Sequence, residues 1–280
     1  MKKITRRSFL AAAGLTAAAL ALTACGGSSS STASSTASSA AASSEAASSS
    51  AAAELTTVEA GKLTMATNAA FPPYEMTTDT GAFEGIDVDT AQAIAEKLGL
   101  ELQIDDMDFD AALLSVQQGK ADIVMAGVTV TDERKAVMDF SDSYATGIQS
   151  IIVPEGSDIA TPDDLAGKTI GTQRGTTGYI YCSDDFGDEN VVAYDDGLTA
   201  VQALNNGQVD AVVIDNAPAK EFVAANPGLV ILETSYAEED YAIGMAKGNT
   251  ALEDAVNAAL EELKADGTLQ SIVDKYITAE

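Results

Sequence analysis

The chain has 280 residues, a formal net charge of −28 at neutral pH, and no histidine or tryptophan. So acidic a chain argues against binding to nucleic acid or to anionic lipid surfaces, because both carry negative charge. Without histidine it lacks the usual base of a serine hydrolase and the commonest zinc ligand, and we expect neither a metal nor a cofactor.

Residues 1–24 have the layout of an export signal. Four Lys and Arg residues within the first seven precede an alanine-rich apolar run that is short for a membrane-spanning helix. The run ends in L-T-A followed by Cys25, which resembles the lipobox of bacterial lipoproteins. We therefore expect cleavage before Cys25 and a diacylglycerol on its sulfur. The pair Arg6 and Arg7 leaves export by the Sec or by the twin-arginine route open.

Serine and alanine make up almost all of residues 26–53, and Glu45 carries the only charge there. Such a segment has too few large apolar side chains to offset the entropy of ordering, so we expect residues 25–54 to form a disordered tether. A lipid and a flexible spacer would hold the folded part at the outer face of the cytoplasmic membrane without crossing it.

Strand and helix patterns alternate through the folded part, which predicts an α/β fold. We expect strands at residues 62–68, 100–107, 123–126, 168–172, 191–194, 209–215 and 229–232, and helices at residues 87–98, 111–118, 198–204 and 250–276, the last with a break at 266–267.

The stretch A-D-I-V-M-A-G-V-T-V-T-D-E-R, residues 121–134, is the strongest candidate for a ligand site. A buried strand ends at Ala126 and Gly127, the hydroxyl of Thr129 follows, and Arg134 lies in the first turn of a short helix. Free amides and a guanidinium together suit a small carboxylate. The alternative, an arginine that only pairs with a surface acid, is about as common.

Two earlier positions also follow strands. Asn68 and Phe71 precede or begin the F-P-P-Y-E turn of residues 71–75, in which two prolines stop the strand and fix a loop. Phe109 lies where a strand meets a helix. Its ring belongs either to the core or to a ligand site, and its position leaves both open.

The second half repeats this logic. Gln173 opens a glycine- and threonine-rich loop with Thr176 and Thr177, which lacks the lysine and spacing of a P-loop but suits a carboxylate. Asp215 ends a buried strand, where it is either a ligand-binding acid or the cap of the next helix.

Two extended segments, 145–150 and 241–245, are suited to cross between lobes. We therefore expect lobe 1 to comprise residues 55–146 and 241–280, and lobe 2 to comprise residues 147–240. The first lobe is then built from both ends of the folded chain.

These motifs together resemble those of the family 3 extracellular solute-binding proteins, the polar amino-acid receptors of ABC importers. The resemblance covers nearly all of residues 55–276. It rests on F-P-P-Y-E, G-I-D-V-D, A-G-V-T-V-T-D-E-R, D-F-S, G-T-T-G, V-D-A-V-V-I-D and D-G-T. It implies a type II periplasmic-binding-protein fold, with two hinge crossings, that closes over an amino acid.

The resemblance also implies roles for the candidate residues. Arg134 would bind the α-carboxylate with Thr129, Thr176 and Thr177, and Asp215 would bind the α-ammonium with Gly127 and Thr129. The expected ligand-binding set is Asn68, Phe71, Phe109, Ala126, Gly127, Thr129, Arg134, Gln173, Thr176, Thr177 and Asp215.

Two positions depart from the family pattern. Many members carry an acid at the position of Asn68 and tryptophan at that of Phe109. A neutral amide in place of an acid favours a neutral polar amino acid over a basic one. The pattern does not specify which amino acid.

We expect a monomeric, non-enzymatic receptor that delivers a free amino acid to the transmembrane subunits of an ABC permease. A ligand-binding sensor is an alternative that the sequence cannot separate from a transport receptor. A cyclohexadienyl-dehydratase-like enzyme is a further alternative, which the pairing of Arg134 with Asp215 disfavours. Cys182 is the only other cysteine and is expected to be a small apolar packing residue.

Overall fold

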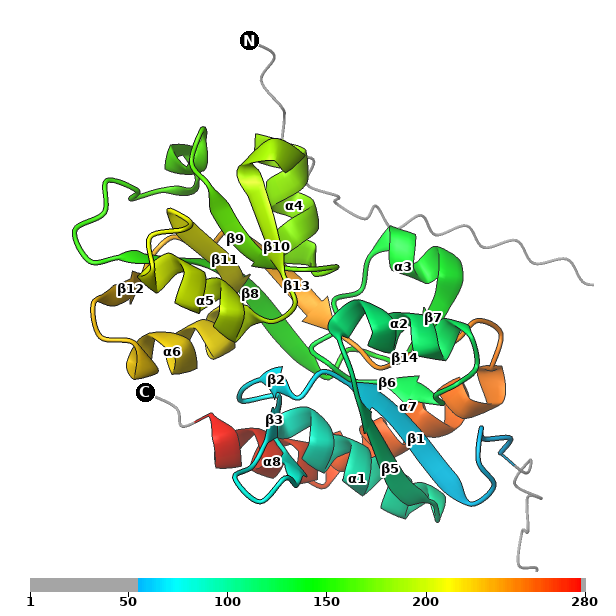
Figure 1. Ribbon diagram of the computed structural model, residues 1–280. Coiled ribbons are helices and arrows are strands. Elements are labelled where there is room, and N and C mark those ends of the chain that lie inside the picture. The colour runs from blue at the N-terminus through cyan, green and yellow to red at the C-terminus, as the bar shows by residue number, and fades with distance from the viewer. Residues whose placement is uncertain (1–54, 278–280) are drawn as a thin grey trace, which may run out of the picture. The chain divides into compact units, whose positions relative to one another are not determined.

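The structure is a computed structural model that describes residues 55–277. The expected export signal, Cys25 and the tether lie outside the described residues. Two mixed sheets form the centres of two lobes, with the first lobe at lower right and the second at upper left in Figure 1.

Lobe 1 is built on a five-stranded sheet in the order β5-β1-β6-β14-β7. Its first three strands are parallel, and β14 runs antiparallel to both of its neighbours. The strands are β1 (Lys62–Thr67), β5 (Glu101–Asp106), β6 (Ile123–Val124), β7 (Met138–Phe140) and β14 (Gly244–Ala246). The last of these comes from the C-terminal part of the chain, so lobe 1 is assembled from two separate segments.

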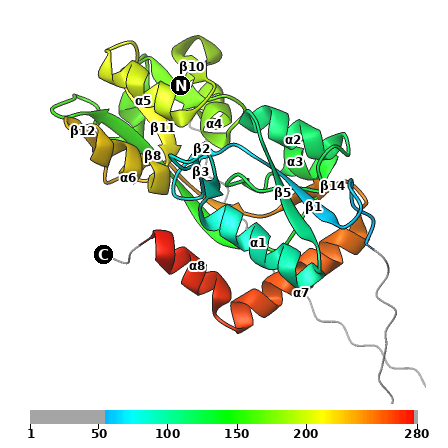
Figure 2. The same ribbon diagram turned by 60° about the horizontal axis from the view of Figure 1, so that its bottom comes forward.

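Five helices cover this sheet: α1 (Ile86–Leu98), α2 (Phe109–Gln117), α3 (Asp132–Val137), α7 (Thr250–Ala265) and α8 (Thr268–Tyr276). Helix α1 buries Ala91, Ile94 and Ala95 at helical spacing and ends at Gly99, which takes the left-handed conformation. Figure 2 shows α7 and α8 beside α1. The expected break between them is present, with Gly267 at a φ of 80°.

A small sheet interrupts the predicted loop after β1. Strands β2 (Ala70–Phe71), β3 (Glu75–Thr77) and β4 (Phe83–Glu84) pair antiparallel. The two prolines interrupt the strand as expected, but the loop expected around them has strand pairing on both sides. The prolines occupy the turn between β2 and β3, where a missing N–H costs no ladder bond, and the chain resumes pairing at Glu75.

Lobe 2 is built on a six-stranded sheet in the order β10-β9-β11-β8-β12, with β13 also paired to β8. The strands are β8 (Ala145–Pro154), β9 (Ile170–Gln173), β10 (Val191–Tyr194), β11 (Ala211–Asp215), β12 (Leu229–Ile231) and β13 (Ala237–Tyr241). The helices are α4 (Thr177–Phe186), α5 (Gly197–Asn205) and α6 (Asn216–Ala225), with short 3₁₀ turns η1 (Pro162–Leu165) and η2 (Asp188–Asn190).

Alternation along β11 explains why helices cover both faces of this sheet. Val212 and Ile214 belong to the cluster that contains residues of α5 and α6, whereas Ala211 and Val213 pack with Cys182 of α4. Cys182 is completely buried, which raises the pKa of its thiol to about 12 and confirms its expected packing role.

Strands β8 and β13 connect the lobes and run beside each other, as Figure 1 shows. They pair antiparallel from Ala145 opposite Tyr241 to Gln149 opposite Ala237. The first crossing lies where the sequence places it. The second begins earlier than expected, at Ala237, and the division of the chain into lobes at residues 146 and 240 stays a prediction.

The types of the helices and strands agree with the sequence prediction more closely than the residues at which they begin and end. The strand expected over 123–126 pairs only at Ile123–Val124, and the helix expected from residue 111 begins at Phe109. Among the helices within residues 55–277, none has both the length and the apolar character needed to span a bilayer.

Candidate functional site

A narrow cavity lies between the two lobes. Its lining contains all eleven residues of the predicted set, together with one residue that was not predicted, Glu75. The lining residues are Asn68, Phe71, Glu75, Phe109, Ala126, Gly127, Thr129, Arg134, Gln173, Thr176, Thr177 and Asp215. The structure thus brings the predicted residues together, while their roles in binding stay predictions.

Arg134 is the cation of the cavity. It follows the cap of α3, where the Thr131 hydroxyl accepts from the Arg134 amide at 3.2 Å. Its guanidinium donates to the carbonyl of Thr129 at 2.8 Å and, across the cleft, to the carbonyl of Gly175 at 3.1 Å. Only 8% of the residue is exposed, so the alternative of a surface ion pair does not apply.

The ring of Phe109 lies under this guanidinium, with its centroid 5.4 Å from the Arg134 carbon. The ring also belongs to a buried cluster around α2. Phe109 therefore fills both of the positions that the sequence left open, in the core and at the cavity. Arg134 retains three N–H donors beyond the two used by the carbonyls, enough for a bidentate carboxylate.

Asp215, the last residue of β11, is the acid that lobe 2 contributes to the cavity lining. Its carboxylate accepts from the Gln149 amide at 2.8 Å and from the Tyr241 hydroxyl. Burial, followed by the charge of Glu239, raises the pKa of Asp215 to about 7. Asp215 occupies the N-cap position of α6, but its side chain makes no capping bond and lines the cavity instead.

Glu239 of β13 is a second buried acid beside Asp215. It is 6% exposed, and its Oε2 accepts from the Thr129 hydroxyl at 3.1 Å and from the Gln149 amide at 3.0 Å. Its charge also opposes the effect of burial, which lowers the pKa of Arg134.

Glu75 and Asp87 form a third acidic group, and both are fully buried. Asp87 accepts from the Tyr144 hydroxyl at 2.7 Å and from the Gly127 amide at 3.0 Å. Burial nevertheless raises the pKa of Asp87 to about 6. The carboxyl of Glu75 interacts with that of Asp87, and burial followed by the charge of Asp87 raises the pKa of Glu75 strongly.

Asn68 and Gln173 meet across the cleft. The Asn68 amide donates to the Met107 carbonyl at 2.9 Å, and its oxygen accepts from Gln173 at 2.8 Å. Because the Asn68 oxygen and amide nitrogen are both engaged, this side chain bridges the lobes. With the bond from Arg134 to Gly175, it holds the cleft closed at two places.

The remaining lining residues shape the cavity. Thr176 caps α4 through the Tyr179 amide at 3.3 Å, and the Thr177 hydroxyl lies 3.5 Å from that of Thr129. Gly127 has a φ of 55°, and a Cβ there would lie 2.9 Å from the Phe71 ring. Only glycine therefore allows this ring to close one side of the cavity.

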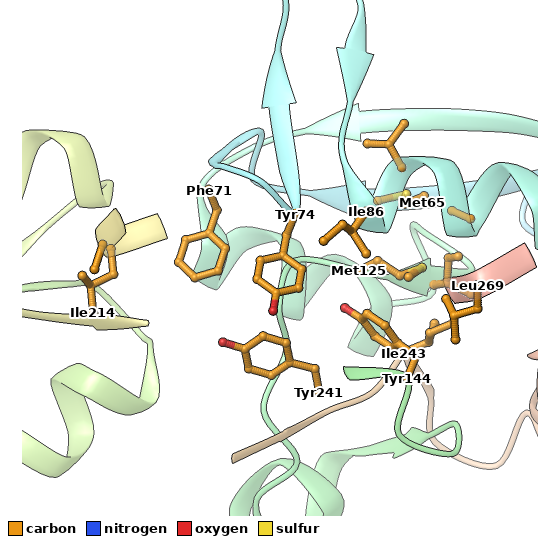
Figure 3. Close-up of a cluster of buried hydrophobic side chains, with 14 of the residues drawn as sticks. Met65, Phe71, Tyr74, Ile86, Met125, Tyr144, Ile214, Tyr241, Ile243 and Leu269 are labelled. Atoms are coloured by element: carbon orange, nitrogen blue, oxygen red, sulfur yellow. The ribbon is translucent and has the colours of Figure 1, made fainter. Parts of the chain in front are cut away.

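Phe71 continues into an aromatic group at the hinge. Its ring centroid lies 5.9 Å from that of Tyr74, and Tyr74 lies edge-on to Tyr241 at 5.3 Å. Figure 3 shows these rings between Ile214 of lobe 2 and the apolar core of lobe 1. The hinge strand β13 thus packs directly against the wall of the cavity.

One arginine faces several buried acids in this cavity. A ligand that brings one carboxylate and one or more cationic groups would neutralise this arrangement, because buried charges are stable only when they are paired. Within residues 55–277, no three His, Cys, Asp or Glu side chains are grouped so as to hold a metal ion.

Two buried acids at the site, Glu75 and Glu239, were not predicted from the sequence. Glu75 stands at the end of the F-P-P-Y-E motif, and the strand resumed there turns it inward. Along β13, buried Glu239 lies between exposed Glu238 and Asp240, which is the alternation expected of a strand with one buried face. The run A-E-E-D-Y hides the alternation because three of its residues are acidic.

Comparisons with known proteins agree with this geometry. Residues 63–279 match the family described as bacterial extracellular solute-binding proteins, family 3. The L-cystine-binding protein TcyJ of Escherichia coli is 34% identical over 226 residues, which cover 79% of this chain and 85% of the relative. The arginine-binding extracellular protein ArtP of Bacillus subtilis is 32% identical, with coverages of 78% and 87%.

Solved structures give the same result. The arginine-, lysine-, histidine-binding protein ArtJ of Geobacillus stearothermophilus superposes with a TM-score of 0.75 at 35% identity, covering 78% of this chain and 96% of its own. An ancestral arginine-binding protein bound to arginine has a TM-score of 0.74 at 42% identity, with coverages of 78% and 98%. These likenesses confirm the expected two-lobe, type II fold.

Proposed function

This chain belongs to the family 3 bacterial extracellular solute-binding proteins, and we propose that it binds an amino acid with a basic side chain for an ABC importer. The relatives are named as binding proteins, which confirms the expectation of a receptor rather than an enzyme. The substrate itself, the delivery to a permease and the lipid anchor are parts of the proposal.

The proposal that the ligand is an amino acid rests on the positions of Arg134 and Asp215. One is a buried guanidinium with free donors, and the other is a buried carboxylate, and both line one cavity. A ligand with a carboxylate at one end and an ammonium at the other satisfies both groups. Opposite charges in a water-poor cleft discriminate strongly against ligands that lack either group.

The proposal of a basic ligand side chain rests on Glu75. This residue is a fully buried acid that lines the cavity beside Asp87, and burial raises its pKa strongly, so that its ionised form is costly there unless a cation meets it. A guanidinium or ammonium at the end of the ligand side chain would meet that need. The rings of Phe71 and Phe109 offer flat surfaces for its apolar stem.

Asn68 led the sequence analysis towards a neutral polar ligand. In the structure its amide bonds to Met107 and Gln173, so its neutrality does not bear directly on the ligand. The names of several relatives specify arginine, and we extend that ligand class to this chain on the strength of Glu75. Arginine is our first choice, because its planar fork suits a carboxylate best.

The remainder of the proposal comes from the sequence. Lipidation at Cys25 and a tether over residues 25–54 would keep the two lobes near the outer face of the cytoplasmic membrane. There a closed, loaded receptor would meet the transmembrane subunits of its permease. Ligand contacts to both lobes would favour the closed state, because only that state offers the full set of partners.

Isothermal titration of residues 55–280 with the twenty L-amino acids and L-cystine tests this proposal. A ligand at one hundred times its dissociation constant should also add about 2.7 kcal/mol of stability, visible as a higher melting temperature. We expect tight binding of L-arginine and weaker binding of L-lysine. Preference for L-glutamine or L-cystine would contradict the basic side chain, and no binding to any amino acid would contradict the receptor itself.

A further inference from the structure

Glu239 does not line the cavity, yet it is 94% buried directly behind the ammonium end of the site. It lies on β13 between two exposed residues, Glu238 and Asp240. The Tyr181 side chain of α4 also interacts with the Glu239 carboxylate. A buried acid is costly unless its oxygens are bonded, so its presence calls for a specific role.

The partners of Glu239 belong to the binding site. Its Oε2 accepts from the Thr129 hydroxyl at 3.1 Å and from the Gln149 amide nitrogen at 3.0 Å. The same Gln149 nitrogen donates to Asp215 at 2.8 Å. Both hydrogens of this amide are therefore directed at carboxylates, one on each side.

This arrangement sets the polarity of the Thr129 hydroxyl. A hydroxyl has one hydrogen and two lone pairs, whereas a carboxylate can only accept. With its hydrogen directed to Glu239, Thr129 presents lone pairs to the cavity. An ammonium group has three donors and no acceptor, so it requires oxygens in this orientation.

The backbone keeps these groups in register. The Val130 amide donates to the Asp240 carbonyl at 3.0 Å, and the Ala242 amide donates to the Val128 carbonyl at 3.1 Å. Thr129 itself forms an isolated antiparallel bridge with Tyr241. The loop that carries Thr129 is therefore hydrogen-bonded to the end of the hinge strand that carries Glu239.

We propose that Glu239 is a positioning residue of the ammonium subsite. It fixes the Thr129 hydroxyl as an acceptor and, through Gln149, orients the Asp215 carboxylate, so that this end of the cavity admits only hydrogen-bond donors. Because Glu239 lies on the hinge strand β13, the residue that orients these two groups belongs to the segment that crosses between the lobes. The inference rests on the proposed function, since it requires a ligand with an ammonium group.

Two substitutions at Glu239 separate its contributions. Glu239→Leu removes the acceptor at similar size, whereas Glu239→Gln keeps one acceptor oxygen and removes the charge. Each variant is titrated with L-arginine and with 5-guanidinopentanoate, which is arginine without its ammonium, at millimolar concentration if necessary. Glu238→Gln, an exposed change on the same strand, is the matched control, and circular dichroism checks each fold.

We expect Glu239→Leu to weaken L-arginine binding at least twentyfold and 5-guanidinopentanoate binding less than threefold. Glu239→Gln should fall between Glu239→Leu and the wild type, and Glu238→Gln should match the wild type within twofold. A double-mutant cycle with Thr129→Val adds a second readout. The loss from Glu239→Leu should shrink at least fivefold in that background, because the hydroxyl it orients is absent.

Equal losses for both ligands would show a merely structural role, and additive losses in the cycle would show that Glu239 does not act through Thr129. Either result overturns the inference while leaving the receptor function intact. If the wild type prefers another amino acid, that amino acid and its 2-deamino analogue replace the arginine pair. If the wild type binds no amino acid, the proposed function fails and the inference fails with it.

Discussion

At the scale of single residues, the site depends on groups that are buried with donors or acceptors unused. Arg134 bonds to two backbone carbonyls and keeps further N–H groups, and Glu75 meets only another acid, Asp87. Such groups cost free energy in the empty protein, and a ligand recovers that cost when it binds. Substitutions at these positions should therefore affect binding more than folding.

Arg134→Lys tests the geometry of the carboxylate site separately from its charge. Lysine keeps a positive charge but loses the planar fork, so we expect amino-acid affinity to fall by about 30-fold or more. Titration calorimetry measures the loss. Arg174→Lys is the control, because Arg174 is exposed and pairs with Asp195 on the surface. Affinity within threefold of wild type would contradict the role of the Arg134 guanidinium.

Glu75→Gln tests the choice of ligand side chain. The amide is almost the same size and removes the acid, which a ligand cation would ionise. We expect affinity for L-arginine to fall by roughly 100-fold while affinity for L-glutamine stays equal or rises. Denaturation should show a fold at least as stable as wild type. Glu84→Gln, on the neighbouring strand β4 and exposed, provides the control. Parallel losses for both ligands would argue that Glu75 only supports the fold.

At the scale of elements, the crossing strands form one wall of the site as well as the hinge. Tyr241 of β13 packs between Gly127, Gly147 and Tyr74, and its hydroxyl donates to Asp215 of lobe 2. A Cβ on Gly147 would overlap the Tyr241 ring and hydroxyl. Glycine at this position in β8 thus lets the tyrosine lie flat across the crossing.

Gly147→Ala should displace Tyr241 from Asp215. We expect a loss of about 1 to 3 kcal/mol in stability from overpacking, together with at least a tenfold loss of amino-acid affinity, because the carboxylate loses its donor. Chemical denaturation and titration calorimetry measure the two effects. Ile148→Ala, at a half-exposed neighbour on the same strand, should change affinity little. Normal affinity in Gly147→Ala would mean that the tyrosine is not needed.

The sequence predicted element types because hydrophobic periodicity and glycine stops are local signals. The helix break at Asp266 and Gly267 and the strand ending at Asp215 are both visible in the pattern. It could not predict that Glu75 faces inward, because that depends on pairing between β2 and β3 across two prolines. The inward orientation of Glu239 could not be predicted for the same reason. It depends on the register in which β13 pairs with β8, and register is a tertiary property.

The residues of the candidate site could be predicted from the sequence about as well as the element types. Its eleven residues came from strand ends and loops, together with a family resemblance that assigned their roles. The bond between Asn68 and Gln173 was not foreseeable, because it joins positions 105 residues apart across the cleft. Its effect was to change the interpretation of Asn68 from a selector of the ligand to a bridge between lobes.

At the scale of the whole molecule, the buried acids link ligand binding to protons. The pKa of Asp215 is raised to about 7 and that of Asp87 to about 6, chiefly by burial. Each acid therefore holds a proton in the empty fold at a pH where the unfolded chain has lost it. It follows that these groups make the empty protein less stable as the pH rises from about 4 to about 7.

Ligand binding should reverse this effect. An ammonium beside Asp215 favours the ionised carboxylate, so binding should release protons and affinity should rise between pH 5 and pH 8. Calorimetric titrations in phosphate and Tris, which differ in ionisation enthalpy, measure the released protons. The same ligand without its ammonium should release fewer. Proton uptake on binding, or an affinity that falls with rising pH, would contradict this assignment.

The pairing of β8 with β13 has a mechanical consequence. The two strands are bonded over five opposed pairs and form a twisted ribbon. Stretching the ribbon or sliding one strand past the other would break these hydrogen bonds, whereas a change in its twist would not. A rotation of the lobes about this ribbon would then open the cleft with the ladder intact. If the chain delivers its ligand as proposed, a permease that contacts both lobes would need only to drive that rotation to release the ligand.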